Sequence, residues 1–232
     1  MSHTTVVAWL ALRELWISFR LLLILVAFVA GGTVATFVAR GASVTLEWLA
    51  LGLAVAVALT GAMAAWSMAE ERRSGRAGWL AARSVGRGSI VAGWLGAFGI
   101  AALAGLVAAA TLVWVAVAPL LPQLTPAGYA AAMAAIGGWC VTVVASGLVV
   151  GIALPVPLAA AVVTGAIGAG VVVAAWSWSV PEVVPGAALP LLARAAEMPA
   201  LAGPALRAAG MSLAMAAVMT VIARALLERV EL

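Results

Sequence analysis

The residues whose types and spacing could carry chemistry form one charged cluster in an otherwise apolar chain. Residues 70–88 contain two glutamates and five arginines, together with glycines at 75 and 86. Acids and arginines at such close spacing form ion pairs with one another and with charged groups on a partner protein. The candidate partner-contacting residues are Glu70, Glu71, Arg72, Arg73, Gly75, Arg76, Trp79, Leu80, Arg83 and Arg87.

A short apolar turn inside this cluster favours a docking role. Residues 79–83 form a short amphipathic piece between the helix-breaking glycines at 75 and 86. Such a turn can place its apolar face in a cleft of a cytoplasmic partner while its arginines pair with acids at the rim. An ordinary positively charged loop is the alternative, although such a loop would not require a Trp-Leu turn.

Catalytic and metal-binding constellations are missing from the sequence. It contains no lysine, aspartate or asparagine, and His3 is its one histidine. A phosphate-binding P-loop requires lysine, which the sequence lacks. A histidine-based catalytic triad or zinc site would depend on His3, which lies in a frayed N-terminus. Cys140 stands alone in an apolar stretch, so we expect a buried core residue. We therefore expect no enzyme activity, no metal and no cofactor on this chain.

The composition places most of the chain in a bilayer. Of its 232 residues, 66% are hydrophobic and only 9% are charged, whereas soluble domains carry about 25% charged residues. A span needs about 20 mostly apolar residues. Six stretches meet this rule: 17–39, 46–69, 89–118, 128–152, 156–176 and 206–227. We predict an all-α membrane protein with a six-span domain over 17–232, an inner loop at about 70–88 and an outer segment at about 177–205.

The arginines predict the orientation of the spans. Cytoplasmic segments of membrane proteins are enriched in arginine and lysine. With the N-terminus inside, the inner segments hold Arg13, Arg20, Arg72, Arg73, Arg76, Arg83, Arg87, Arg224 and Arg229. The outer segments then hold only Arg40, Arg194 and Arg207. Both termini are therefore expected in the cytoplasm. Because these arginines lie in short loops between apolar runs, we expect no nucleic-acid partner.

The segment before the first span has the pattern of a helix lying in the membrane interface. Residues 1–16 are expected to form it, with apolar side chains at intervals of three and four and charged ones off that face. Its candidate lipid-contacting residues are Trp9, Leu12, Arg13, Trp16, Phe19 and Arg20. A simple extension of the first span into the cytoplasm is the alternative.

The middle of the chain is free of charged side chains. Residues 88–181 contain no charged residue and no histidine. Ion-coupled transporters usually place ionisable groups at membrane depth. A proton-driven antiporter or pump is therefore disfavoured, and energy for any transport has to come from another source.

The cluster at 70–94 resembles the first cytoplasmic loop of ABC transporter type 2 permeases. Residues 71–75 resemble the family's acidic-basic cluster and its Glu-x-Gly, residues 79–80 its Leu-rich turn, and residues 84–87 its Pro-Val-Ser-Arg. The chain lacks the family's threonine after Gly75, its proline at 84 and its lysine at 94. The order of an inner-face helix, six spans, one coupling loop and a long outer segment also matches.

The resemblance implies an exporter permease in the bacterial inner membrane. Such a permease dimerises with a second copy or a homologous permease and docks a separate ATP-binding cassette subunit, which binds ATP and Mg²⁺. The loop at 70–88 would be the coupling helix, and the transported substrate would be hydrophobic or amphipathic. The haem-exporter membrane subunit of cytochrome c maturation and a non-transporting assembly scaffold are the alternatives.

The resemblance also implies short re-entrant helices in the outer segment, where they would form a gate. The segment contains several prolines with apolar stretches between them, which would be costly to leave in water. Its gate candidates are Trp178, Leu189, Leu192, Arg194 and Glu197. A loosely held outer loop is the alternative.

Overall fold

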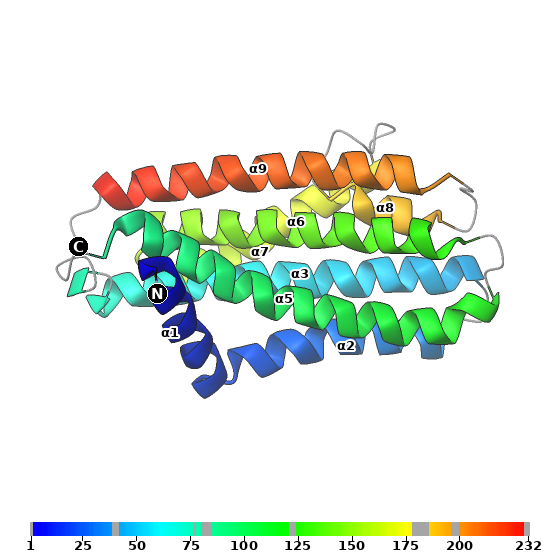
Figure 1. Cartoon of the computed structure of the whole chain (residues 1–232), viewed down its shortest axis with the longest axis horizontal. Coiled ribbons are helices and arrows are strands. Elements are labelled where there is room, and N and C mark those ends of the chain that lie inside the picture. The colour runs from blue at the N-terminus through cyan, green and yellow to red at the C-terminus, as the bar shows by residue number, and fades with distance from the viewer. Residues whose placement is uncertain are drawn as a thin grey trace.

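Six long apolar helices make up most of the structure and run side by side along one axis (Figure 1). The computed structural model describes residues 2–38, 42–76, 78–79, 85–120, 124–177, 186–195 and 200–229. These residues form helices and connections without any strand. The long helices are α2 (Arg20–Val38), α3 (Ala42–Arg73), α5 (Arg87–Val117), α6 (Pro126–Ala153), α7 (Pro157–Ser177) and α9 (Ala202–Arg229). Each is long and apolar enough to cross a membrane, so the chain is a multi-pass all-α membrane protein.

The six predicted spans coincide with these helices, and the largest difference in length is at α3. This helix has 32 residues and extends beyond the predicted span 46–69 at both ends. At a rise of about 1.5 Å per residue it is about 48 Å long, whereas the hydrocarbon core of a bilayer is about 30 Å thick. Its last turn therefore extends past the hydrocarbon, and this turn carries the charged residues from Glu70 to Arg73.

Helix α6 lies at the centre of the bundle and is buried along most of its length. It contacts α3, α5, α7 and α9, and it crosses α3 where both helices carry small residues. A methyl group on Gly151 would lie 2.5 Å from the carbonyl oxygen of Ala65, and one on Gly147 would overlap the carbonyl oxygen of Gly61. The two backbones can approach this closely only because these positions have no side chain.

Helix α1 (His3–Ile17) is a separate element that crosses the bundle steeply near one end (Figure 1). It packs on α5 through Val7, Ala11 and Leu15. Helix α1 ends at Ile17 and α2 begins at Arg20. Between them Phe19 adopts a left-handed φ of 59°. The first span is thus not a straight continuation of α1.

The start of α1, the end of α3, the start of α5 and the end of α9 all lie at the same end of the bundle (Figure 1). Most of the described arginines lie there too, on these four helix ends and at the start of α2. We call this the charged end, defined by Glu14, Arg20, residues 70–76, residues 87–89 and residues 224–229. The charge distribution along the bundle is therefore as asymmetric as the arginine positions predict.

Two short helices lie toward the opposite end. The η1 turn (Ala118–Leu120) continues α5, and α8 (Ala188–Ala193) packs against α3, α6 and α9. Every residue of α8 is buried, including Leu189 and Leu192, while Arg194 at its end is exposed. The gate candidates Trp178 and Glu197 lie outside the described residues.

Candidate functional site

The guanidinium of Arg76 joins two helices of the charged end. Its Nη1 donates to Glu14 Oε2 at 2.7 Å and its Nη2 donates to Glu14 Oε1 at 2.8 Å, so that both carboxylate oxygens are engaged. Nη2 also lies 3.2 Å from Glu71 Oε1. Glu14 belongs to α1 and Glu71 to α3. Arg76, which follows α3, therefore connects that helix end to α1.

A glycine turn places Arg76 in this position. Helix α3 ends at Arg73, and Gly75 then adopts a φ of 71°. The amide of Ser74 donates to the carbonyl of Glu70 at 2.9 Å, and the amide of Gly75 donates to that of Arg72 at 3.1 Å. Left-handed glycines of this kind commonly terminate helices. The chain consequently reverses sharply and turns Arg76 back toward α1.

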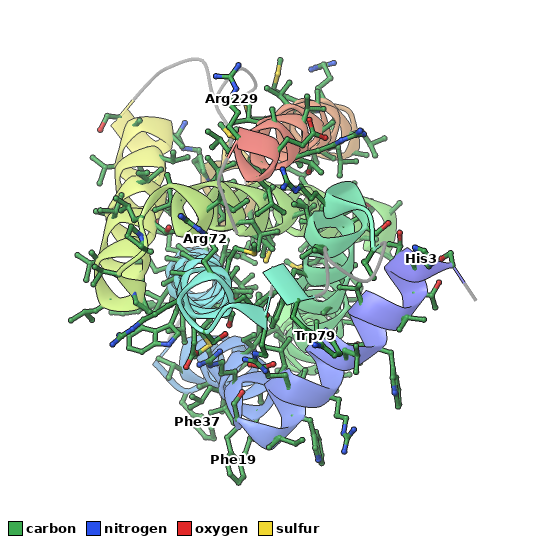
Figure 2. The ribbon with its side chains drawn as sticks, turned by 90° about the vertical axis from the view of Figure 1, so that its left-hand side faces the viewer. His3, Phe19, Phe37, Arg72, Trp79 and Arg229 are labelled. Carbon is green, nitrogen blue, oxygen red and sulfur yellow. The ribbon has the colours of Figure 1, made fainter. Side chains whose placement is uncertain are left out.

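A short helical turn follows directly after this glycine. Arg76, Gly78 and Trp79 are helical, and the amide of Trp79 donates to the carbonyl of Gly75 at 3.0 Å. The side chain of Trp79 is 55% exposed. Figure 2 shows Trp79 at the end of the bundle that faces the viewer. An exposed tryptophan therefore stands three residues from an arginine that is anchored to two helices.

A second ion pair ties α2 to α3 at the same end. Arg20 Nη2 donates to Glu70 Oε2 at 2.7 Å, and Arg20 Nη1 donates to the hydroxyl of Ser67 at 2.7 Å. Ser67 is buried, and the Arg20 side chain is only 18% exposed. The planar guanidinium can engage both oxygens at once because its donors form a fixed fork. This pair fixes the start of α2 against the last turns of α3.

Arg72 extends the network to the central helix. Its Nη1 donates to the carbonyl of Ile152 in the last turn of α6. The last four carbonyls of a helix have no partner within that helix, and a cation there also complements the helix dipole. Figure 2 shows Arg72 between α3 and α6 in the end-on view. The end of α3 is thus bonded to α1, α2 and α6.

The electrostatic environment keeps Arg76 charged. The hydrogen bonds that it donates to Glu14 raise the pKa of Arg76 above its ordinary value, and the nearby charge of Glu71 acts in the same direction. The side chain of Glu71 is 6% exposed and lies against this guanidinium. A buried carboxylate is costly unless it is paired, so Glu71 depends on Arg76 remaining in place.

Arg87 takes part in a different contact. Its Nη1 donates to the carbonyl of Glu228 at 2.5 Å, and Arg224 Nε donates to Glu228 Oε1 at 2.9 Å. The Arg87 bond joins the start of α5 to the end of α9, and the Arg224 bond lies within α9. Arg87, the last of the candidate partner-contacting residues, bonds to α9 and not to the network around Arg76.

The structure brings together most of the described residues that were expected to contact a partner. Glu70, Glu71, Arg72 and Arg76 form one bonded network, and Arg73 lies exposed beside it. Leu80 and Arg83 lie outside the described residues. The expectation did not include Glu14 or Ser67 in this network. Glu14 stood out in the sequence only as a charge off the apolar face of residues 9–20.

The N-terminal helix presents an exposed apolar surface at the charged end. Trp9 and Trp16 are 65% and 68% exposed, and Arg13 lies exposed between them on the helix. Leu12 is half-buried, Phe19 lies in the junction after the helix, and Arg20 begins α2. The exposed face of α1 therefore carries Trp9, Arg13 and Trp16 close together.

A comparison of the chain with protein-family models finds no match, and a comparison with curated proteins finds no significant relative.

Proposed function

We propose that the chain is the membrane subunit of an ATP-driven exporter of the ABC type 2 permease class, and that residues 70–87 dock a separate ATPase subunit. One observation carries this proposal. The exposed turn at Trp79 follows directly after Arg76, which is bonded to Glu14 on α1 and to Glu71 on α3. A force applied to the turn is therefore passed to two helices rather than absorbed by a loose loop.

The residue types at this turn suit a protein interface. Tryptophan and arginine are the residues most often found to dominate binding energy in protein–protein contacts. Trp79 is exposed, and Arg73 and Arg76 lie on the same stretch of chain. An acidic-rimmed apolar cleft on the partner would complement this surface.

The proposal orients the chain with its charged end in the cytoplasm of a bacterium and its six spans in the inner membrane. The arginines then lie on the inner side, as in other inner-membrane proteins. Helix α1 lies in the membrane interface, with Trp9 and Trp16 among the headgroups and Arg13 near lipid phosphate. Helix α8 serves as a short re-entrant element at the outer end, with Leu189 and Leu192 closing the path and Arg194 facing outward.

The partners follow from the same assignment. ATP and Mg²⁺ bind the ATPase subunit, this chain contributes no catalytic group, and a second permease copy or a homologous permease completes the membrane domain. The uncharged spans favour a hydrophobic or amphipathic substrate.

Site-specific photocrosslinking tests the docking surface. A photoreactive amino acid replaces Trp79 in living cells, and the crosslinked protein is identified by mass spectrometry. Two exposed positions serve as controls: Trp16 on α1 at the charged end, and Phe37 near the opposite end of α2. We expect position 79 to capture a protein that carries a P-loop lysine motif, and the controls not to capture it. If position 79 gives no adduct with such an ATPase in correctly inserted protein, the proposal is wrong.

A further inference from the structure

One buried hydroxyl inside the bundle lacks the hydrogen bond that other hydroxyls of the spans make. Thr164 on α7 is 1% exposed, and its Oγ1 has no hydrogen-bond partner among the described residues. Thr60, by comparison, donates to the carbonyl of Ala56 at 2.8 Å, in the usual manner of a helical threonine. A buried hydroxyl without a partner is unfavourable, most of all in a bilayer. A bound polar group that accepts a hydrogen bond from Thr164 would relieve this cost.

Thr164 lines a cleft of about 100 Å³ between three helices. Its floor is α6, and its walls are α7 and α9. Its lining includes Trp139, Thr142, Ser146, Thr164, Met215 and Met219. All of them lie near the middle of their helices, so the cleft lies near the middle of the bilayer. Each water-sized group takes about 30 Å³ of liquid volume, so the cleft accommodates a small polar head.

The hydrogen-bonding character of the cleft is well defined. Thr142 Oγ1 donates to the carbonyl of Ser212 at 2.6 Å, and Ser146 Oγ donates to the carbonyl of Thr142 at 2.9 Å. Because both protons are used, these oxygens can offer only lone pairs, whereas Thr164 has a proton without an acceptor. The complementary ligand group both donates and accepts a hydrogen bond, as an alcohol or a primary amide does.

The cleft opens toward the lipid between α7 and α9. Ile167, at its edge, is 47% exposed, and Met215 and Met219 are partly exposed. The lining residues carry no charge, so an ionised head would lose its hydration without gaining a counter-ion. An apolar tail would leave through the opening into the hydrocarbon.

We propose that this cleft binds the head of a neutral amphiphile that bears a hydroxyl or primary amide, with Thr164 donating to it and Thr142 and Ser146 accepting from it. The inference concerns binding to this chain alone and does not rest on the proposed ATPase partner. The crosslinking result at Trp79 therefore neither supports nor contradicts it.

Photolabelling of the purified chain in detergent tests the site. The probe is a long-chain primary alcohol with a diazirine in its tail, and adducts are mapped by mass spectrometry. Thr164→Val removes the hydroxyl at nearly constant volume. Thr111→Val on α5 is the matched control, since the hydroxyl of Thr111 is exposed and already donates to the carbonyl of Val107 at 2.8 Å.

We expect adducts around the cleft on α6, α7 and α9 that excess unlabelled alcohol displaces and the corresponding alkane does not. Thr164→Val should weaken labelling there roughly three- to tenfold, which corresponds to one hydrogen bond, and Thr111→Val should not. Ser146→Ala serves as a second test should Thr164→Val fold poorly. Adducts spread evenly over the lipid-facing helices, or labelling that Thr164→Val leaves unchanged, would overturn the proposal.

Discussion

Arg76 engages both carboxylate oxygens of Glu14, although the two residues are 62 positions apart in the sequence. This contact joins the connection after α3 to a helix that lies across the end of the bundle. Half of the Arg76 side chain remains exposed, at 50%, so the pair lies at the surface that the proposed ATPase partner would reach.

Removing this anchor should uncouple the proposed exporter without unfolding it. Arg76→Ala and Trp79→Ala should each abolish the stimulation of ATP hydrolysis by the membrane subunit in reconstituted vesicles. The melting temperature of Trp79→Ala should change little because this side chain is exposed. Arg76→Ala should lower the melting temperature further, because it removes an exposed pair with Glu14, worth about 0–1 kcal/mol, and also leaves the buried Glu71 without its cation. Arg229→Ala on α9, an exposed arginine at the charged end that is not among the candidate docking residues, is the control. Normal stimulation by both variants would contradict the coupling role.

The pairing itself can be tested by exchanging the charges. Glu14→Arg alone and Arg76→Glu alone should each impair coupling, since each places like charges together. The double variant should restore it in part, because the opposite charges then face each other again. Restoration will be incomplete, as the new glutamate at position 76 would lie beside Glu71. If the loss of coupling in the double variant equals the sum of the losses in the two single variants, the contact between residues 14 and 76 does not contribute to coupling.

The turn at Gly75 should tolerate asparagine better than alanine. A methyl group at this position meets no atom within 4 Å, so the cost of substitution is purely conformational. The left-handed conformation costs most residues about 1–2 kcal/mol, whereas asparagine adopts it more readily. Gly75→Ala should therefore destabilise the chain and reduce coupling more than Gly75→Asn, as measured by chemical denaturation and ATPase stimulation. Equal effects of the two variants would argue against a conformational role.

The crossing of α3 and α6 should be the most sensitive point of the bundle. Gly147→Ala places a methyl group against the backbone of Gly61, so one helix has to shift, at a cost of about 1–3 kcal/mol. Gly165→Ala on α7 is the matched control, because its new methyl group meets nothing within 4 Å. It should be neutral or stabilise the helix by up to about 1 kcal/mol. Thermal unfolding in detergent measures both, and a Gly147→Ala variant as stable as Gly165→Ala would disprove the close packing.

Reporter fusions should confirm the proposed orientation. Alkaline phosphatase is active only outside the cytoplasm, so fusions between α2 and α3, and between α5 and α6, should be active. Phosphatase fusions after Trp79 and at the C-terminus should be inactive. Fusions of a green fluorescent protein at the same two positions should be fluorescent. The reverse pattern would place the charged end outside and exclude contact with a cytoplasmic ATPase.

The spans were predictable because each needs a long uninterrupted apolar run, and such runs are visible in any single sequence. The predicted span 128–152 and the helix α6 (Pro126–Ala153) differ by only two residues at the start and one at the end. The sequence predicted a separate N-terminal helix over residues 1–16, and in the structure α1 ends at Ile17. The exact position of its junction with α2 depends on the left-handed conformation of Phe19, which sequence preference opposes.

Contacts between distant residues were not predictable in the same way. The sequence marked Arg76 as exposed and partner-facing, and nothing in it paired that residue with Glu14. The apolar pattern of residues 9–20 drew attention to Trp9 and Trp16, whereas the buried face of α1 consists of the less conspicuous Val7, Ala11 and Leu15. A helix with apolar residues on two sides leaves the choice of buried face to tertiary packing.

The backbone contact between Gly61 and Gly147 has a mechanical consequence. Two helices that touch without intervening side chains cannot slide or tilt independently, and Arg72 fastens their ends together as well. A push on the connection after α3 would therefore displace α3 and α6 as a single rigid strut. In the proposed exporter, the relative motion that opens a path through the membrane would then occur at the flanks of this strut, against α7 and α9.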